Sequence, residues 1–275
     1  MKPSTFVNFA LLLLLTACNL PEAGSPVPQT TSPTLAPTNT AVSAGPATTF
    51  NNVNITIPAG LGTDAVSQTV PAVTDPNAAT WDMAPTHLEV TLTGYPVQGK
   101  FHQPKIYVYP ANEYAQINIG AAESLERVRN AATGAPLSVV NMPGIPFFNA
   151  AQVFAAQIQA LTFQNGSGLR LVTEYAQYPA PINNYELFYH FQGLTNDGSY
   201  YVIAILPVTA PILAETERPD AAIPAGGVPL PAGAVPDEAY YTAITERLNA
   251  LSPESFNPSL TLLDSMIRSI LVANP

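Results

Sequence analysis

The chain has 275 residues, of which Lys, Arg, Asp and Glu make up 10%, well below the roughly 25% of an average globular protein. Its formal net charge of −10 disfavours binding to nucleic acid, and it also disfavours attachment to anionic lipid through a basic patch. The 47% of hydrophobic residues can still bury a sizeable core, and the single cysteine excludes an internal disulfide.

The N-terminal segment has the pattern of an export signal. Lys2 supplies a positive charge, and Phe6 to Leu15 form an apolar run of about ten residues, too short for the roughly 20 that a spanning helix needs. The sequence Leu-Thr-Ala-Cys then ends at Cys18. This sequence resembles the lipobox of bacterial lipoproteins, in which small residues admit a peptidase and the thiol accepts a diacylglyceryl group.

The resemblance implies that signal peptidase II removes residues 1–17 and that Cys18 becomes the lipidated first residue. Two or three acyl chains anchor a protein stably where a single chain is marginal. We therefore predict an extracytoplasmic protein attached by lipid to the inner or the outer bacterial membrane. An ordinary secretory signal and an uncleaved stub are the alternatives.

Residues 18–50 are predicted to be a linker. The stretch from Asn19 to Thr49 is rich in Pro, Thr, Ser and Ala and holds one charged residue, Glu22. Such a composition cannot bury a core, so we expect a disordered tether that is partly polyproline II. At ~3.1 Å per residue, its reach would be at most roughly 90 Å.

Three strands are predicted at the start of the folded part. Residues 53–61, 87–97 and 104–110 alternate apolar and polar side chains or end in turn residues. Residues 112–131 predict one or two helices, with Gly120 as a weak point. Residues 147–163 predict a further helix, capped by Asn149 and Gln152 and ended by Gly166 and Gly168.

A long hairpin follows the predicted central helix. Asn196, Asp197 and Gly198 mark a turn between two strands, and the strand after it is apolar on both faces. Residues 207–236 are rich in Pro and Gly and predict a long loop. Two helices close the chain, one beginning near Asp237 and one with Asn257 as N-cap and Pro258 at its first position.

This order predicts an α+β fold, an antiparallel sheet with helices packed on it, in a single domain of residues 51–275. Two short stretches at the ends of this domain also fit a known arrangement of strands and helices: Ile55, Ile57, Pro58, Gly60, Leu263, Met266, Ile267 and Ser269. With these residues, the order of elements resembles the PsbP/Mog1-type α+β sandwich, which occurs in bacterial lipoproteins, and the resemblance implies an architecture without a chemistry. The whole chain also resembles uncharacterised lipoproteins of environmental bacteria.

The sequence carries no recognised catalytic, metal-binding or cofactor-binding motif, so we expect no enzyme activity, metal or cofactor. His87, His102 and His190 lack metal-ligand spacing, and we interpret them as satisfied or solvent-facing side chains. Glu186 stands among aromatic residues, where burial would raise its pKa. The alternatives for Glu186 are an exposed strand edge and a buried pairing with Arg170.

Tyrosines gather beside amide side chains in the second half of the chain, a common lining for sugar or peptide sites. Cross-strand tyrosine pairs on a sheet face are the simpler explanation. Tyr175 and Tyr178 precede the group. The candidate ligand-binding residues are Tyr185, Tyr189, Tyr200, Tyr201, Asn183, Asn184 and Gln192.

Three functions are compatible with these features. A binding module of the cell envelope, acting on an unknown protein, glycan or small molecule, is the first. An assembly factor is the second, and an envelope hydrolase without a recognisable motif is the third. A pocket with convergent polar groups favours binding or catalysis, whereas a broad exposed apolar patch without pockets favours assembly.

Overall fold

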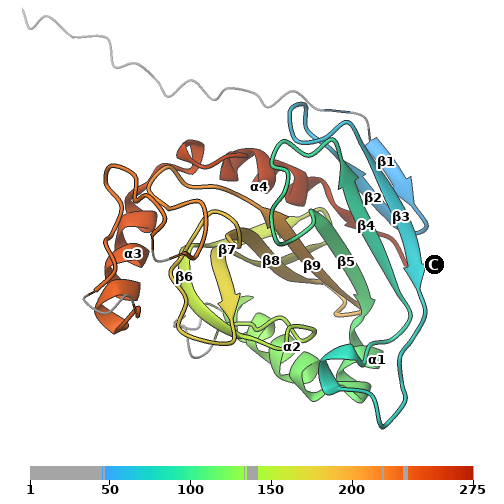
Figure 1. Ribbon diagram of the computed structural model, residues 1–275. Helices are drawn as coiled ribbons and strands as arrows, with labels where there is room; N and C mark the ends of the chain where they lie inside the picture. Colours follow the sequence, from blue (N-terminus) through green and yellow to red (C-terminus); the bar gives the residue numbers. More distant parts are fainter. Residues whose placement is uncertain are drawn as a thin grey trace, which may run out of the picture. The chain divides into compact units, whose positions relative to one another are not determined.

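The computed structural model describes residues 45–274 apart from 46, 133, 135–141, 219 and 232–234. The predicted signal peptide, Cys18 and the linker up to residue 44 lie outside the described residues. Four α-helices pack on two antiparallel sheets in the described part of the chain (Figure 1). The predicted α+β fold class is therefore confirmed.

The larger sheet has seven strands, and each neighbouring pair is antiparallel. The strands are β3 (Asp64–Val70), β4 (His87–Thr93), β5 (Lys105–Pro110), β6 (Ala151–Phe163), β7 (Gly166–Ala176), β8 (Phe188–Thr195) and β9 (Tyr200–Pro207). Their order across the sheet is β3-β4-β5-β9-β8-β7-β6. Every residue of β8 is buried, as a central strand covered on both faces requires.

A smaller sheet joins the two ends of the folded part. Its strands are β1 (Ala47–Phe50), β2 (Val53–Thr56) and β10 (Leu271–Val272), in the order β1-β2-β10. Val53 pairs with Val272 across the β2–β10 ladder. Because β1 lies inside the predicted linker of residues 18–50, regular structure begins earlier than the predicted boundary at residue 51.

Helices cover both faces of the larger sheet (Figure 1). The alternating side chains of β9 separate the two faces: Val202, Ala204 and Leu206 face one core, while Ile203 and Ile205 face the other. The helices are α1 (Ala111–Ile117), α2 (Ile119–Ala132), α3 (Glu238–Ala250) and α4 (Leu260–Ser269), with 3-10 turns η1 (Thr80–Asp82) and η3 (Pro253–Ser255).

The first core, on the side that we call the α4 face, also contains Leu263 and Ile267 of α4 and Ile55 of β2. The second, on the α2 face, contains Tyr114 of α1 and Leu125 of α2. Both cores are continuous sets of buried apolar side chains. Burying such side chains stabilises the fold by roughly 1.5–3 kcal/mol each relative to leaving them exposed.

Most predicted elements are present. Strands occupy the three early segments as β2, β4 and β5, and the hairpin turn at residues 196–198 connects β8 and β9. Residues 112–131 form two helices whose break falls at Asn118, next to the predicted weak point Gly120. Asp237 caps α3, because its carboxylate accepts a hydrogen bond from the Tyr240 N–H at 2.8 Å.

The helix predicted for residues 147–163 is wrong, because Ala151–Phe163 form strand β6 and the four residues before them lie outside any helix. Its ladder with β7 is shifted twice, between Gln152 and Phe154 and between Ala156 and Gln159. Gln157 adopts a φ of 55° at the second shift. Each shift adds a residue to the strand and breaks its period of two, so the apolar spacing mimics that of a helix.

The glycines expected to end that helix belong to the partner strand β7. A Cβ atom on Gly168 would lie 2.1 Å from the carbonyl oxygen of Gln192 in β8. The strands approach so closely at this position that only glycine fits. Gly168 is therefore explained by sheet packing.

The predicted start of the last helix is also corrected. Ser259 is the N-cap of α4, and its hydroxyl accepts a hydrogen bond from the Leu262 N–H at 3.2 Å. Asn257 instead pairs its backbone with Thr209, with N···O distances of 2.8 and 3.0 Å. The backbone of Asn257 is thus held in an extended bridge to the proline-rich loop before the helix begins.

A buried ion pair ties α4 to the larger sheet. Arg170 of β7 donates from Nε to Asp264 Oδ1 at 3.1 Å, and the two side chains are only 2% and 6% exposed. The Tyr189 hydroxyl donates to the same carboxylate oxygen at 2.9 Å. Arg170 also donates to the Gln157 carbonyl oxygen at the second bulge of β6. This pairing excludes the predicted alternative in which Arg170 pairs with Glu186.

Candidate functional site

An aromatic cleft with a volume of ≈410 Å³ opens at one end of the α2 face. Four segments build it: the loop before β5, residues 147–150 directly before β6, the end of β7 with the residues that follow it, and the turn before β8. Its volume lies in the range of sites for small molecules. The lining residues are Phe101, His102, Phe147, Phe148, Asn149, Ala150, Tyr175, Ala176, Gln177, Tyr178, Ala180 and Glu186.

The walls are held by ring-to-ring packing. His102 stacks on Phe148, with ring centroids 5.3 Å apart and an interplanar angle of 11°, and its ring meets the edge of Phe188 at 4.5 Å. Tyr175 meets Phe148 edge-on at 5.2 Å. Offset and edge-on aromatic pairs of this kind each contribute about 0.5–1.5 kcal/mol beyond their buried area. The aromatic wall is therefore largely preformed.

His102 is a neutral polar group in this wall. Burial among the aromatic rings lowers its pKa from 6.5 to about 4, so the imidazole is uncharged at neutral pH. Among the described residues, none makes a hydrogen bond to its ring nitrogens, so a bound molecule could use one as donor and the other as acceptor. His190 lies deeper, and its Nδ1 has no partner in the described part of the chain.

Two hydrogen bonds join the segments that line the cleft. The Ile145 N–H donates to the Tyr175 hydroxyl oxygen at 3.2 Å. Gln177 donates from its side-chain amide to the Asn149 carbonyl oxygen at 2.7 Å. Burial raises the pKa of Tyr175, so its phenol keeps its proton at neutral pH and can donate it to a ligand.

Exposed aromatic side chains stand at the cleft mouth. Phe101 and Tyr178 are each 61% exposed, a large fraction for aromatic residues. Tyr185, from the turn before β8, is 37% exposed and meets the Phe101 ring at 6.2 Å. A backbone hydrogen bond of 2.9 Å from Phe101 N to Tyr185 O fixes this contact. Exposed aromatic residues gathered around a hollow are typical of binding sites.

A pair of carboxyl groups adjoins the cleft. Asn183 donates from one side-chain nitrogen to Glu174 at 3.3 Å and to Glu186 at 3.1 Å, which brings the two carboxyl groups together. Glu186 lines the cleft, while Glu174 has no exposed surface. Burial, and then the neighbouring Glu186, raise the pKa of Glu174 well above its ordinary value. The buried member of this pair is therefore Glu174, and Glu186 lies between it and the cleft.

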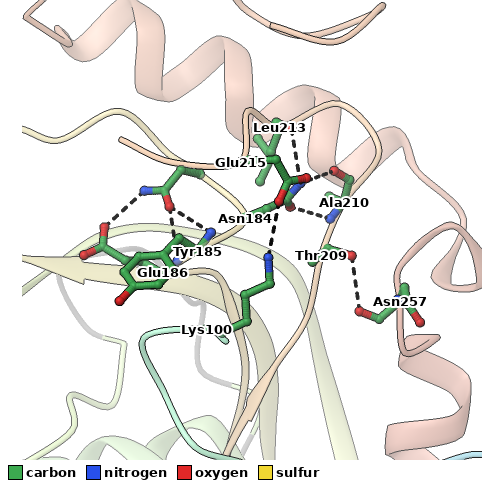
Figure 2. A network of polar contacts seen from close by, with 10 residues as sticks. Lys100, Asn184, Tyr185, Glu186, Thr209, Ala210, Leu213, Glu215 and Asn257 are labelled. Atoms are coloured by element: carbon green, nitrogen blue, oxygen red, sulfur yellow. Dashed lines mark hydrogen bonds and ion pairs between the residues drawn. The ribbon is translucent and has the colours of Figure 1, made fainter. Parts of the chain in front are cut away.

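The candidate residues Asn183 and Asn184 use their amides within the protein. Asn183 also accepts hydrogen bonds from the backbone N–H groups of Tyr185 and Glu186. Asn184 donates to the carbonyl oxygens of Ala210 and Leu213, both at 3.2 Å, and so holds the proline-rich loop (Figure 2). These two amides shape the turn that presents Tyr185 and Glu186.

The remaining candidates lie on different faces of the larger sheet. Tyr189 points into the core of the α4 face, where it meets Asp264. Tyr201 and Gln192 lie on the α2 face, and the Tyr201 hydroxyl donates to the Gln192 side chain. Tyr200 packs at the border of the first core. Of the seven candidates, Tyr185 alone has a ring contact with a residue of the cleft.

Sequence reasoning overlooked most of the cleft. It did not single out the dipeptides Phe101-His102 and Phe147-Phe148 as site residues, and it interpreted His102 as a satisfied or solvent-facing side chain. Both aromatic pairs lie in irregular segments, so packing within a sheet does not explain why aromatic residues occur there. Aromatic pairs in loops are the signal that could have indicated a binding site. Tyr175 and Tyr178, which precede the predicted group, both line the cleft.

Among the described residues, no group of three or more His, Cys, Asp or Glu side chains is placed to hold a metal ion. No family model, no curated protein and no solved structure matches the chain. The geometry of the cleft is therefore the basis for proposing what the folded part does.

Proposed function

We propose that this chain is a lipid-anchored, extracytoplasmic protein of the bacterial envelope, and that its folded part binds a ligand in the aromatic cleft. The observation that carries the binding function is the cleft itself. It combines ≈410 Å³ of space with ring walls and with the polar groups of His102, Tyr175 and Glu186. Apolar walls with few convergent polar groups are the usual composition of a small-molecule site.

The anchoring part of the proposal rests on the sequence up to Cys18, which lies outside the described residues. In the described part of the chain, no helix is both long and apolar enough to cross a membrane. Acylation of Cys18 would supply the attachment, since two or three acyl chains suffice for stable anchoring.

An envelope hydrolase is the alternative function. Such an enzyme needs an acid and a base, or a nucleophile, that reach the substrate. Glu174 has no exposed surface, so Glu186 is the only member of the carboxyl pair that faces the cleft. This geometry favours binding over hydrolysis.

Lipidation is tested by replacing Cys18 with Ala in the full chain. We expect the unchanged protein to enter the detergent-rich phase of a phase-partitioning experiment and the C18A variant to enter the aqueous phase. Ser43→Ala, which lies in the predicted linker, is the matched control and should partition like the unchanged protein. Retention of C18A in the detergent phase would contradict the anchor.

Ligand binding is tested by saturation-transfer NMR on the full chain in a neutral detergent. The panel contains neutral sugars, organic cations and aromatic acids. At least one class should bind, and Tyr178→Ala should weaken that binding about tenfold, because stacking on an exposed ring contributes on the order of 1 kcal/mol or more. Trp81→Ala, an exposed aromatic of η1 that does not line the cleft, is the control. If no member of the panel binds, or if both variants bind like the unchanged protein, the cleft is not the binding site.

A further inference from the structure

The cleft has no positive charge of its own. No lysine or arginine is among the described residues that line it, and its imidazole, His102, is neutral at pH 7. Glu186 is the one acidic side chain in the lining. An anionic ligand would therefore meet a carboxylate without a compensating cation, which disfavours its binding.

Two basic side chains that adjoin the cleft residues already have partners. Lys100, beside Phe101, forms an ion pair with Glu215 at 3.4 Å, and Figure 2 shows its side chain pointing to Glu215. Arg127, which acts on the Tyr175 phenol through its charge, donates to the Met142 carbonyl oxygen at 3.1 Å. It also lies 3.9 Å from Glu123. Neither cation is free to neutralise Glu186.

The carboxyl pair is short of positive charge. Asn183 is a neutral donor that Glu174 and Glu186 share, and it carries no charge that could balance a carboxylate. Burial, and then the neighbouring Glu186 and Glu217, raise the pKa of Glu174, so Glu186 is the member of the pair that offers its carboxylate to the cleft. A cation in the cleft beside Glu186 would balance that charge, because opposite charges in a partly buried site attract strongly.

The walls also favour a cation. The faces of aromatic rings carry negative electrostatic potential, and a cation within about 6 Å of a ring centroid is attracted to it. Phe147, Phe148, Tyr175 and Tyr178 present several rings to one space. Such a site suits a cation that is apolar on its outside and needs little water, as a substituted ammonium does.

We propose that the aromatic cleft recognises an organic cation whose charge is surrounded by apolar groups, a substituted ammonium, with Glu186 as its counter-ion. This inference rests on the proposed binding function and specifies its ligand class. The rings would enclose the apolar substituents, and the Glu186 carboxylate would balance the charge. The Tyr175 hydroxyl and the His102 imidazole could hydrogen-bond to a polar group elsewhere on the ligand.

The test compares two probes of nearly equal shape on the full chain in a neutral detergent: choline and its uncharged analogue 3,3-dimethylbutan-1-ol. Calorimetry or ligand-observed NMR at pH 7 should give choline at least tenfold tighter binding, since one desolvated cation–π contact alone accounts for roughly a thirtyfold difference. Equal binding of the two probes, or no binding of choline, would overturn the inference.

Two variants locate the effect. Glu186→Gln keeps the size of the side chain and should weaken choline binding about fivefold or more while leaving the neutral alcohol unchanged. Glu126→Gln, an exposed carboxylate on α2 that pairs with Arg129, is the matched control for the loss of one negative charge and should leave both probes unchanged. Loss of choline binding in both variants to the same degree would point to the net charge and overturn the role of Glu186.

The failure of this inference can be distinguished from the failure of the proposed function. If neutral sugars bind, Tyr178→Ala weakens their binding and choline does not bind, the cleft is a binding site for another class of ligand. If neither choline nor any other member of the panel binds, both proposals fail.

Discussion

Strand β7 contributes Arg170 to one buried carboxylate site and Glu174 to another, and the two sites differ in whether a cation balances the carboxylate. At Arg170, the carboxylate of Asp264 meets a guanidinium group and a tyrosine hydroxyl, and its charge is balanced inside the protein. At Glu174, the neighbouring group is a second carboxyl, Glu186, and the shared donor is the neutral amide of Asn183. The first site lies deep between the sheet and α4, and the second lies beside a cleft.

The difference separates a structural role from a binding role. A buried charge that already has its partner mainly fixes the position of α4 on the sheet, and it has nothing further to bind. A carboxyl pair without a cation stays protonated or attracts a positive ligand. The protein therefore uses similar residues for two purposes, according to what the surrounding elements supply.

The largest effect is expected from Asp264→Ala. This change leaves the Arg170 charge buried without a carboxylate and the Tyr189 hydroxyl without its acceptor. We expect the free energy of unfolding to fall by about 3–5 kcal/mol, measured by urea denaturation. Glu123→Ala, which breaks an exposed pair with Arg127, is the control and should cost less than about 1 kcal/mol. A similar loss of unfolding free energy in both variants would show that the buried carboxylate of Asp264 contributes no more to stability than the exposed one of Glu123.

An intermediate effect is expected from Glu174→Gln and depends on pH. The folded protein raises the pKa of Glu174, so the folded state holds the proton more tightly than the unfolded state. The resulting stabilisation is complete below the ordinary pKa of about 4.5 and is lost as the pH rises through the folded-state pKa. The unchanged protein should therefore lose more stability than E174Q between pH 5 and pH 8, by on the order of 1–3 kcal/mol.

Chemical denaturation of both proteins at several pH values measures this difference. The three histidines with lowered pKa, His87, His102 and His190, act in the opposite direction at acid pH, and their effects cancel when the two proteins are compared. Parallel stability curves for the unchanged protein and E174Q would mean that Glu174 is not protonated preferentially in the folded state.

The smallest effect is expected from Glu215→Ala. This side chain is 78% exposed, and it pairs with Lys100 at 3.4 Å and accepts from Asn184 at 3.4 Å. Exposed ion pairs contribute little because water screens them, so the loss should stay below about 1 kcal/mol in urea denaturation. A loss as large as that of Asp264→Ala would show that burial does not set the strength of these pairs.

The sequence predicts the regular strands better than the bulged one. Alternating apolar and polar side chains identify β2 and β4, and the turn at Asn196 to Gly198 identifies the β8–β9 hairpin. The two register shifts of β6 disturb its alternation and produce a helical spacing. Strand β3 escapes prediction because it is an edge strand with mostly exposed side chains, so little apolar pattern remains.

The candidate site is less predictable than the fold for a geometric reason. Phe101, Phe148 and Tyr178 come from three segments that are distant in sequence and meet only through the sheet order, while Glu186 follows Tyr178 in the connection between β7 and β8. Tyrosines that are close in sequence can point to opposite faces, as Tyr189 and Tyr201 do. Proximity along the chain therefore gave a group of aromatics, and tertiary structure decided which of them line one space.

The pairing of β2 with β10 has a consequence for the order of events during synthesis. Val53 leaves the ribosome long before its ladder partner Val272, so the smaller sheet cannot close until nearly the whole chain has been made. Loop closure over such a separation is slow compared with local hairpin formation. The nascent protein consequently exposes the edge of β2 that pairs with β10 until translation ends. A chain stopped before Leu271 would lack the strand that completes this sheet.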